Sequence, residues 1–152
     1  MMETTINKPI HKYDLLERVI LGIIYFSGGK ISKTKLAALV YLLSEKIEDL
    51  KKEIDPYIFL VSKTLGDSSV NTFIEALDIE NNLVDDINYF NKETNKVVEE
   101  ISLTKKGYEI INDYLNDCTK EELEAIKEIV NQYKDFSDEA LVNLILENLK
   151  HS

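Results

Sequence analysis

The side chains best suited to chemistry lie between positions 68 and 82, a stretch with the apolar spacing of an α-helix. One face of this helix would carry the residues at i, i+3, i+4 and i+7, which are Val70, Phe73, Ile74 and Leu77. The start of the same stretch carries hydroxyl and amide groups at Ser68, Ser69, Asn71 and Thr72. Asparagine can form two hydrogen bonds with adenine, and serine or threonine can contact phosphate. If this helix binds DNA, these are the groups that would contact bases and phosphate.

The charge balance opposes this interpretation. The chain has 28 acidic and 18 basic residues, a net charge of −10, and Arg18 is its only arginine. Between positions 63 and 104 the basic residues are Lys63, Lys92 and Lys96, against nine acidic residues, which gives a net charge of −6. Because affinity for DNA comes largely from neutralising phosphates, this balance counts against tight DNA binding, and a solvated helix face is at least as good an interpretation. An acidic surface would also suit a basic protein partner, or could mimic DNA.

Two further groups of lysines bear on the DNA hypothesis. Lys30, Lys33 and Lys35 lie at the start of a predicted helix, and Lys105 and Lys106 follow a predicted hairpin. These lysines would support phosphate contacts if they lay on the same surface as the base-reading helix. The alternative is that they only solvate helix starts and turns.

Catalysis has little support in the sequence. Gly28-Gly29-Lys30 lacks the upstream glycine of a phosphate-binding loop. His11 and His151 lie near the ends of the chain, away from any catalytic arrangement with serine or cysteine. The acidic neighbours Asp85-Asp86 and Glu99-Glu100 would point to opposite faces of a strand and so chelate poorly. We therefore expect no enzyme activity, no metal and no cofactor.

The bulk properties are those of one globular domain. The chain has 152 residues and is 44% hydrophobic, without an apolar run long enough to cross a membrane. The first twelve residues lack the apolar core of a secretory signal. Cys118 is the only cysteine, so no internal disulfide can form, and its thiol is expected to be a partly buried structural group rather than a sensor. A cytoplasmic location is the expectation.

Periodicity divides the first half of the chain into helices. Asp14 and Glu17 have the spacing of a capping box that opens a helix through residue 26, and Gly28-Gly29 would end it. Ser32 would cap a central helix over residues 31–50. The aromatic and β-branched stretch 57–62 predicts a short strand.

The second half predicts a hairpin and three helices. Stretches 83–90 and 97–104 read as strands joined by a polar turn, with Ile101 and Leu103 inward. Thr104 would start one helix, the capping box of Thr119 and Glu122 a second, and Ser137 a third.

The last helix has more apolar surface than a surface helix needs. Its apolar residues include Leu141, Val142, Ile145 and Leu149. They predict a homodimer interface, and the alternative is packing against the rest of the chain. The expected organisation is a tail over residues 1–12, a domain over 13–116 and a helical extension over 117–152.

Two motifs carry a resemblance to known families. The step Leu103-Thr104-x-x-Gly107 out of the hairpin, together with ISKTKLAALVYLL, resembles archaeal winged-helix proteins predicted to be transcriptional regulators. A remoter likeness is to the SocA-like antitoxin (Panacea) domain, through Lys35, Leu36, Leu39, Tyr41 and Leu42. That family continues with Tyr-Gly-Pro, where this chain has Thr64-Leu65-Gly66-Asp67.

The resemblance implies a mainly α winged helix-turn-helix fold with a β-hairpin wing and extra C-terminal helices. It implies a dimeric DNA-binding regulator in which Ser69, Asn71 and Thr72 face DNA while Lys92 and Lys96 contact the backbone. The alternative is an acidic winged-helix module that binds a protein, as an antitoxin or a DNA mimic would.

Overall fold

The computed structural model describes residues 10–54 and 74–150. The predicted strand over residues 57–62 and the predicted helix start at residue 68 lie outside these ranges. The described elements are α2 (Leu15–Phe26), β1 (Lys30–Ser32), α3 (Lys33–Ser44), α4 (Glu48–Lys51), the π-helical segment η1 (Ala76–Glu80), β2 (Val84–Asn91), β3 (Lys96–Leu103), α7 (Lys105–Asn116), α8 (Lys120–Tyr133) and α9 (Asp138–Lys150).

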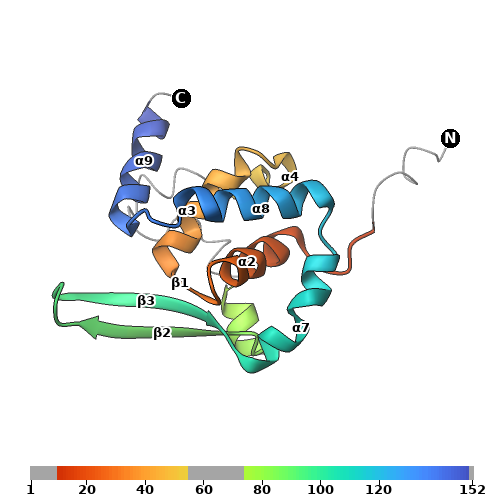
Figure 1. Cartoon of the computed structure of the whole chain (residues 1–152), viewed down its shortest axis with the longest axis horizontal. Helices are drawn as coiled ribbons and strands as arrows, with labels where there is room; N and C mark the ends of the chain where they lie inside the picture. Colours follow the sequence, from red (N-terminus) through yellow and green to blue (C-terminus); the bar gives the residue numbers. More distant parts are fainter. Residues whose placement is uncertain (1–9, 55–73, 151–152) are drawn as a thin grey trace.

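Helix α2 is the centre of the molecule. It contacts α3, α4, α7, α8 and the sheet (Figure 1). Six of its aliphatic side chains are at most 1% exposed: Leu16, Val19, Ile20, Leu21, Ile23 and Ile24. This helix is therefore buried on more than one side. Its end is also as predicted, since Gly28 and Gly29 have φ angles of +92° and +91°, which glycine adopts readily.

The predicted capping box at the start of α2 is wrong. Asp14 is the N-cap residue, but its side chain accepts no capping hydrogen bond. The Glu17 carboxyl instead lies beside Asp14 and Tyr114, and burial raises its pKa. The Glu17 carboxyl therefore interacts with the Asp14 side chain and with Tyr114 of α7.

The predicted central helix over residues 31–50 is two helices. Ser32 caps α3 as predicted, accepting a hydrogen bond from Lys35 N at 3.1 Å. The helix ends at Ser44, whose hydroxyl bonds back to the Tyr41 carbonyl, and Ile47 is extended before α4 begins. Leu50 of α4 is fully buried in the core. The apolar spacing of residues 31–50 therefore shows no sign of the break between the two helices.

A three-stranded antiparallel sheet lies against α2 and α3. The strand order is β1-β3-β2. Ile101 of β3 lies opposite Ile31 of β1 and opposite Asp86 of β2. The hairpin of β2 and β3 is confirmed, with Ile101 fully buried and Leu103 7% exposed. Strand β1 was not predicted, because three residues are too few to show a period.

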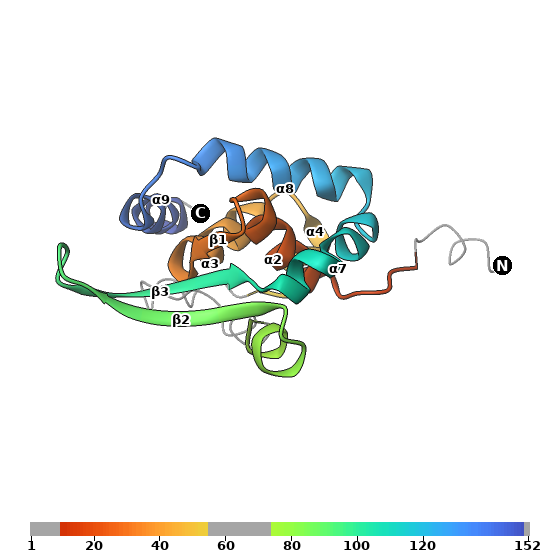
Figure 2. The same ribbon diagram turned by 60° about the horizontal axis from the view of Figure 1, so that its bottom comes forward.

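The elements form layers. Helices α2 and α3 contact β3 on one side and α8 on the other, as Figure 2 shows, and α9 packs along α3. The described part of the segment expected as an extension, residues 117–150, thus covers one face of the central helices. Residues 11 and 12, expected in the tail, contact the end of α7: His11 Nδ1 lies 2.7 Å from the Asp117 carbonyl and Lys12 N donates to its carboxylate.

The Leu-Thr-x-x-Gly step closes the base of the hairpin. The Thr104 hydroxyl donates to the Asn82 carbonyl at 2.7 Å and accepts from Gly107 N at 3.0 Å, capping α7. A Cβ at Gly107 would collide with the Leu83 carbonyl oxygen, which belongs to the backbone and cannot step aside. Glycine is therefore required for α7 to pass this close to the start of β2.

Arg18 ties α2 to α8 through buried charge. Its side chain is 2% exposed and donates from Nη2 to both Glu122 oxygens at 3.1 and 3.2 Å. Nη1 donates to the Tyr13 carbonyl and lies 3.7 Å from Asp117. Burial acts to raise the pKa of Asp117, but the N–H groups of Lys12 and Tyr13 and the Arg18 charge outweigh it, so the pKa is lowered.

The Arg18–Glu122 pair can be tested by removing its negative charge alone. Glutamine at position 122 keeps the capping box of α8, so Glu122→Gln leaves Arg18 buried with less compensation. We expect the free energy of unfolding to fall by about 2–3 kcal/mol in urea titrations followed by circular dichroism.

The matched control is Glu121→Gln, an exposed change in the same first turn of α8. Glu121→Gln should lower the free energy of unfolding by about 0.5 kcal/mol, because it removes only a favourable charge at the positive end of the helix dipole. Equal losses in the two variants would show that the ion pair contributes nothing specific.

Candidate nucleic-acid interface

The structure describes only part of the predicted interface. Five of its residues, Lys63, Ser68, Ser69, Asn71 and Thr72, lie outside the described ranges. The following helical segment is described from residue 74, and its predicted apolar face is confirmed by the full burial of Ile74 and Leu77. It ends where Asn82 takes a positive φ of 54°.

Lys92 and Lys96 lie at the hairpin tip (residues 91–96), at the end of the hairpin away from α7 in Figures 1 and 2, and Lys96 lines a groove with the start of α9. Both side chains are exposed, and neither forms an ion pair with another described residue. The tip is a tight polar turn in which Asn91 Oδ1 accepts hydrogen bonds from Glu93 N at 2.9 Å and Thr94 N at 3.4 Å. Two free ammonium groups thus stand on an ordered turn.

The acidic base of the hairpin is paired with lysines from β1 and α3. Lys33 Nζ lies 3.2 Å from Asp86 and 3.6 Å from Glu99, and its side chain is only 16% exposed. Lys30 Nζ lies 3.9 Å from Glu100. Three of the five hairpin carboxylates are therefore paired with two lysines that lie outside residues 63–104 and are not counted in the net charge of −6. These two lysines support the hairpin rather than a free phosphate site.

Lys35 has a different role from its neighbours. Its ammonium group donates to the carbonyl oxygens of Lys134 and Phe136, both at 3.0 Å. It therefore fixes the link between α8 and α9. Lys105 and Lys106 are exposed in the first turn of α7.

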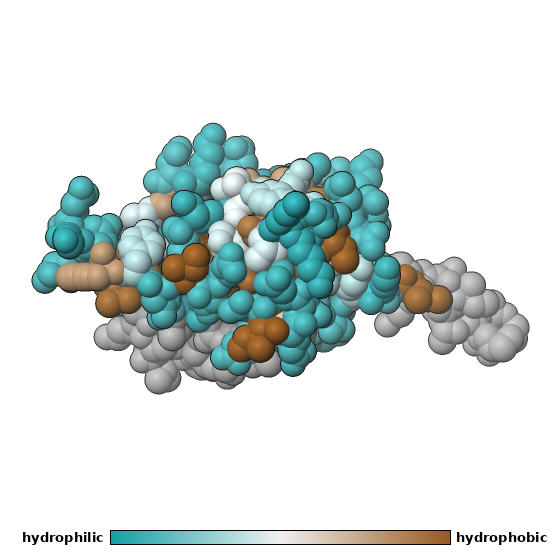
Figure 3. All heavy atoms as spheres, turned by 90° about the horizontal axis from the view of Figure 1, so that it is seen from below, coloured by the Kyte–Doolittle hydropathy of each residue, from teal (hydrophilic) through white to brown (hydrophobic). Residues whose placement is uncertain are grey.

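The hairpin exposes apolar side chains on both faces. Ile87 and Tyr89 are 47% and 44% exposed on one face, and Phe90 and Val97 are 51% and 69% exposed on the other. The view from below shows hydrophobic groups along the hairpin, separated by hydrophilic surface (Figure 3). The sequence predicts a half-exposed hairpin, but not that large apolar side chains are exposed on both of its faces.

The predicted dimer residues of α9 need correction. Leu141 and Ile145 are fully buried in the core of the same chain, because α9 packs along α3. Leu149 is partly buried against that core. Val142 lines a groove between α9 and the outer half of β3, with Val97 and Val98. The core of the same chain thus covers the apolar surface of α9 at Leu141 and Ile145.

Groups with redox or metal chemistry do not assemble among residues 10–54 and 74–150. No three His, Cys, Asp or Glu side chains there are arranged to hold a metal ion. Cys118 is half-buried, its Sγ lies 3.6 Å from the Tyr114 carbonyl, and burial raises the pKa of its thiol. A raised thiol pKa lowers the thiolate fraction and hence its reactivity.

Comparison of the chain with protein-family models, with curated proteins and with solved structures gave no match. Within the described residues, each helix is too short or too polar to serve as a membrane span.

The Lys33 pairs should hold the hairpin to α3. Asp86 Oδ1 is buried and has no hydrogen bond from a described residue, so Asp86 depends on Lys33 for compensation. We expect Lys33→Gln to lower the opening free energy of β2 and β3 amides by about 1–2 kcal/mol in hydrogen exchange.

As a control, Lys106→Gln removes the same charge from an exposed site. It should change the opening free energy of these amides by less than about 0.5 kcal/mol. Unchanged exchange in Lys33→Gln would mean that the hairpin is held by strand pairing alone.

Proposed function

We propose that the chain is a winged-helix, DNA-binding transcriptional regulator and not an enzyme. The observation that carries the proposal is the order of elements. Apart from the one-turn α4, a helix, a short strand and a second helix precede the segment η1 and a long hairpin, and β1 pairs with the far strand of that hairpin. This order is typical of the winged helix, in which the third helix reads bases and the hairpin is the wing.

The lysines of the hairpin tip support contact with the DNA backbone. Lys92 and Lys96 are exposed and without a described ion-pair partner, whereas carboxylates at the hairpin base are paired with Lys30 and Lys33. In the proposed complex the tip neutralises phosphates, and Ser69, Asn71 and Thr72 contact bases and backbone. Such a protein would act in the cytoplasm.

A homodimer belongs to the same proposal, since two copies would read two half-sites. Its interface must use residues other than Leu141 and Ile145, which are buried in their own chain. Val142 and the exposed hairpin residues are the remaining apolar candidates.

The test is a filter-binding titration with the DNA upstream of the chain's own gene, from about 20 to 200 mM salt. Lys92→Gln with Lys96→Gln should weaken binding by about tenfold and lower the slope of log affinity against log salt by about 2, one for each lost phosphate contact.

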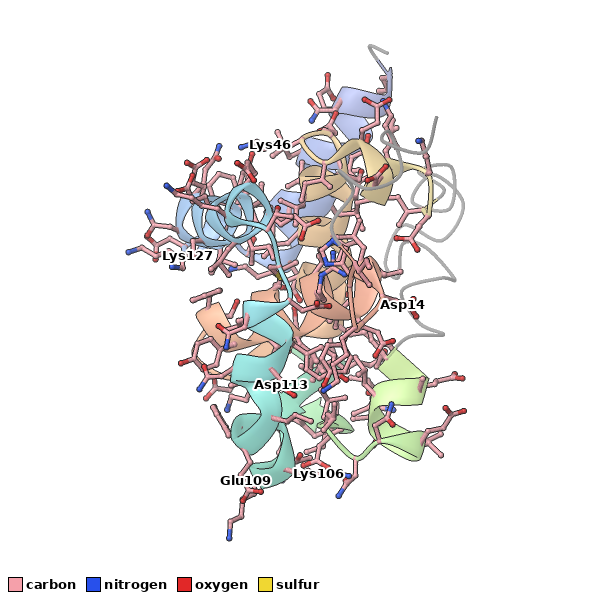
Figure 4. The ribbon with its side chains drawn as sticks, turned by 90° about the vertical axis from the view of Figure 1, so that its right-hand side faces the viewer. Asp14, Lys46, Lys106, Glu109, Asp113 and Lys127 are labelled. Atoms are coloured by element: carbon pink, nitrogen blue, oxygen red, sulfur yellow. The ribbon has the colours of Figure 1, made fainter. Side chains whose placement is uncertain are left out.

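The matched control is Lys46→Gln with Lys120→Gln. Both lysines are exposed and lie away from the hairpin, Lys46 at the end of α3 (Figure 4). This variant has the same net charge, so affinity and slope should stay near those of the parent protein. No binding at the lowest salt, where electrostatic attraction is screened least, would overturn the proposal.

The second candidate is an interaction module that binds a basic protein. The net charge of −10 and the exposed Tyr89 and Phe90 favour it, because aromatic side chains surrounded by charge are common at protein interfaces. Pull-downs from the native host at low and high salt distinguish the two. A protein lost at high salt supports the module, and recovery of nucleic acid without protein counts against it.

A further inference from the structure

A pocket of about 530 Å³ opens between the end of α2, strand β1, the start of α3 and the end of α8. Its apolar lining includes Ile31, Leu39 and Val130, which are 6%, 1% and 7% exposed. Two rings, Phe26 and Phe136, also line it. This volume lies within the range of sites for small ligands, and the mixture of apolar lining and few polar groups is typical of them.

The charge of the pocket is opposite to that of the protein. Four lysines line it, Lys30, Lys35, Lys127 and Lys134, and Asp138 is its one acidic residue. Asp138 Oδ1 accepts a hydrogen bond from the Ser32 hydroxyl at 2.8 Å, which ties this carboxylate to the end of β1. A local excess of positive charge thus surrounds an apolar cavity in a chain of net charge −10.

Two of these lysines are held in place by the pocket wall. Lys35 is fixed by its two carbonyl acceptors in the α8–α9 link, at Lys134 and Phe136. Lys127 Nζ lies 5.4 Å from the centre of the Phe26 ring, a cation–π distance (Figure 4 labels Lys127 on α8).

The positive charges are not compensated by the described part of the chain. Only Lys30 has a carboxylate partner, Glu100 at 3.9 Å, and the Lys30 side chain is 65% exposed. Lys127 and Lys134 form no ion pair with a described residue. Like charges held together cost free energy, and an anion in the pocket would relieve that cost.

We propose that this pocket binds a small aromatic organic anion. The ring lies on the apolar lining near Phe26 and Phe136, and the carboxylate or phosphate group faces Lys127 and Lys134. Because the pocket joins α8 and the α8–α9 link to β1 and α3, its occupancy would stabilise the elements from which Lys30 and Lys33 support the hairpin. The binding itself does not rest on the proposed DNA function.

The probes are 1-naphthoate and its neutral isostere 1-naphthamide, titrated into the full chain and followed by amide shifts in two-dimensional NMR. We expect saturable shifts with 1-naphthoate, centred on residues 26–32 and 130–138, and about tenfold weaker binding of the amide. The double variant Lys127→Gln, Lys134→Gln should bind 1-naphthoate about tenfold more weakly. The control Lys105→Gln, Lys106→Gln removes equal charge from α7 and should change the affinity for 1-naphthoate by less than about twofold.

A steric pair of variants tests the position of the ligand independently of charge. Asn131 lines the pocket and its neighbour Gln132 does not, and both are exposed on α8. Asn131→Trp should abolish binding and Gln132→Trp should preserve it. Equal binding of naphthoate and naphthamide, shifts centred on the hairpin, or no saturable shift up to about 10 mM would overturn the proposal.

Discussion

The buried charge of Arg18 is the constraint on which the arrangement of the helices depends. A guanidinium that is 2% exposed is stable only if its charge is compensated, and Glu122 and Asp117 supply that compensation from either side of the α7–α8 turn. The same Glu122 carboxylate accepts from Thr119 N at 2.9 Å and completes the capping box of α8. The start of α8 and its docking on α2 therefore depend on one side chain. An apolar contact would allow α8 to slide along α2, whereas a two-point hydrogen bond fixes its register.

The position of α8 in turn determines what lies at its other end. Its last turn supplies Val130 and Lys134 to the basic pocket, and the link that follows accepts the hydrogen bonds of Lys35. Lys35 lies in the first turn of α3, next to β1. Lys30 of β1 and Lys33 of α3 in turn form ion pairs with the hairpin. A chain of polar contacts thus joins the α7–α8 turn to the hairpin across the whole molecule. Each of these contacts links elements far apart in the sequence, so the order of helices and strands alone would not show it.

The sequence predicted what short-range physics controls. The caps at Ser32 and Thr119, the glycines that end α2 and the alternation that buries Ile101 are all set by residues within a few positions of one another. Prediction from the sequence failed where contacts between distant parts of the chain determine the local structure. Glu17 interacts with the Asp14 side chain and Tyr114 in place of a capping box, the break between α3 and α4 is not visible in the apolar periodicity, and the three residues of β1 pair with β3. For the candidate site the sequence identified Lys92 and Lys96, but it could not show that Lys33 is used within the fold, nor that four lysines meet at one pocket.

The length of the hairpin reconciles an acidic protein with a proposed contact to phosphate. Net charge governs interactions over distances shorter than the screening length, which is about 8–10 Å at physiological salt. Strands of eight residues span about 26 Å, so the hairpin tip extends several screening lengths from the sheet base. At that distance the carboxylates around α7 and the start of α8 are screened from a phosphate at the tip. The local potential is set by Lys92, Glu93 and Lys96 together with Asp138 and Glu139 of α9, which line a groove with Lys96. The same argument explains why the carboxylates at the hairpin base are paired with lysines: they stand close enough to the body to add to its charge, and unpaired they would repel both the helices and the DNA.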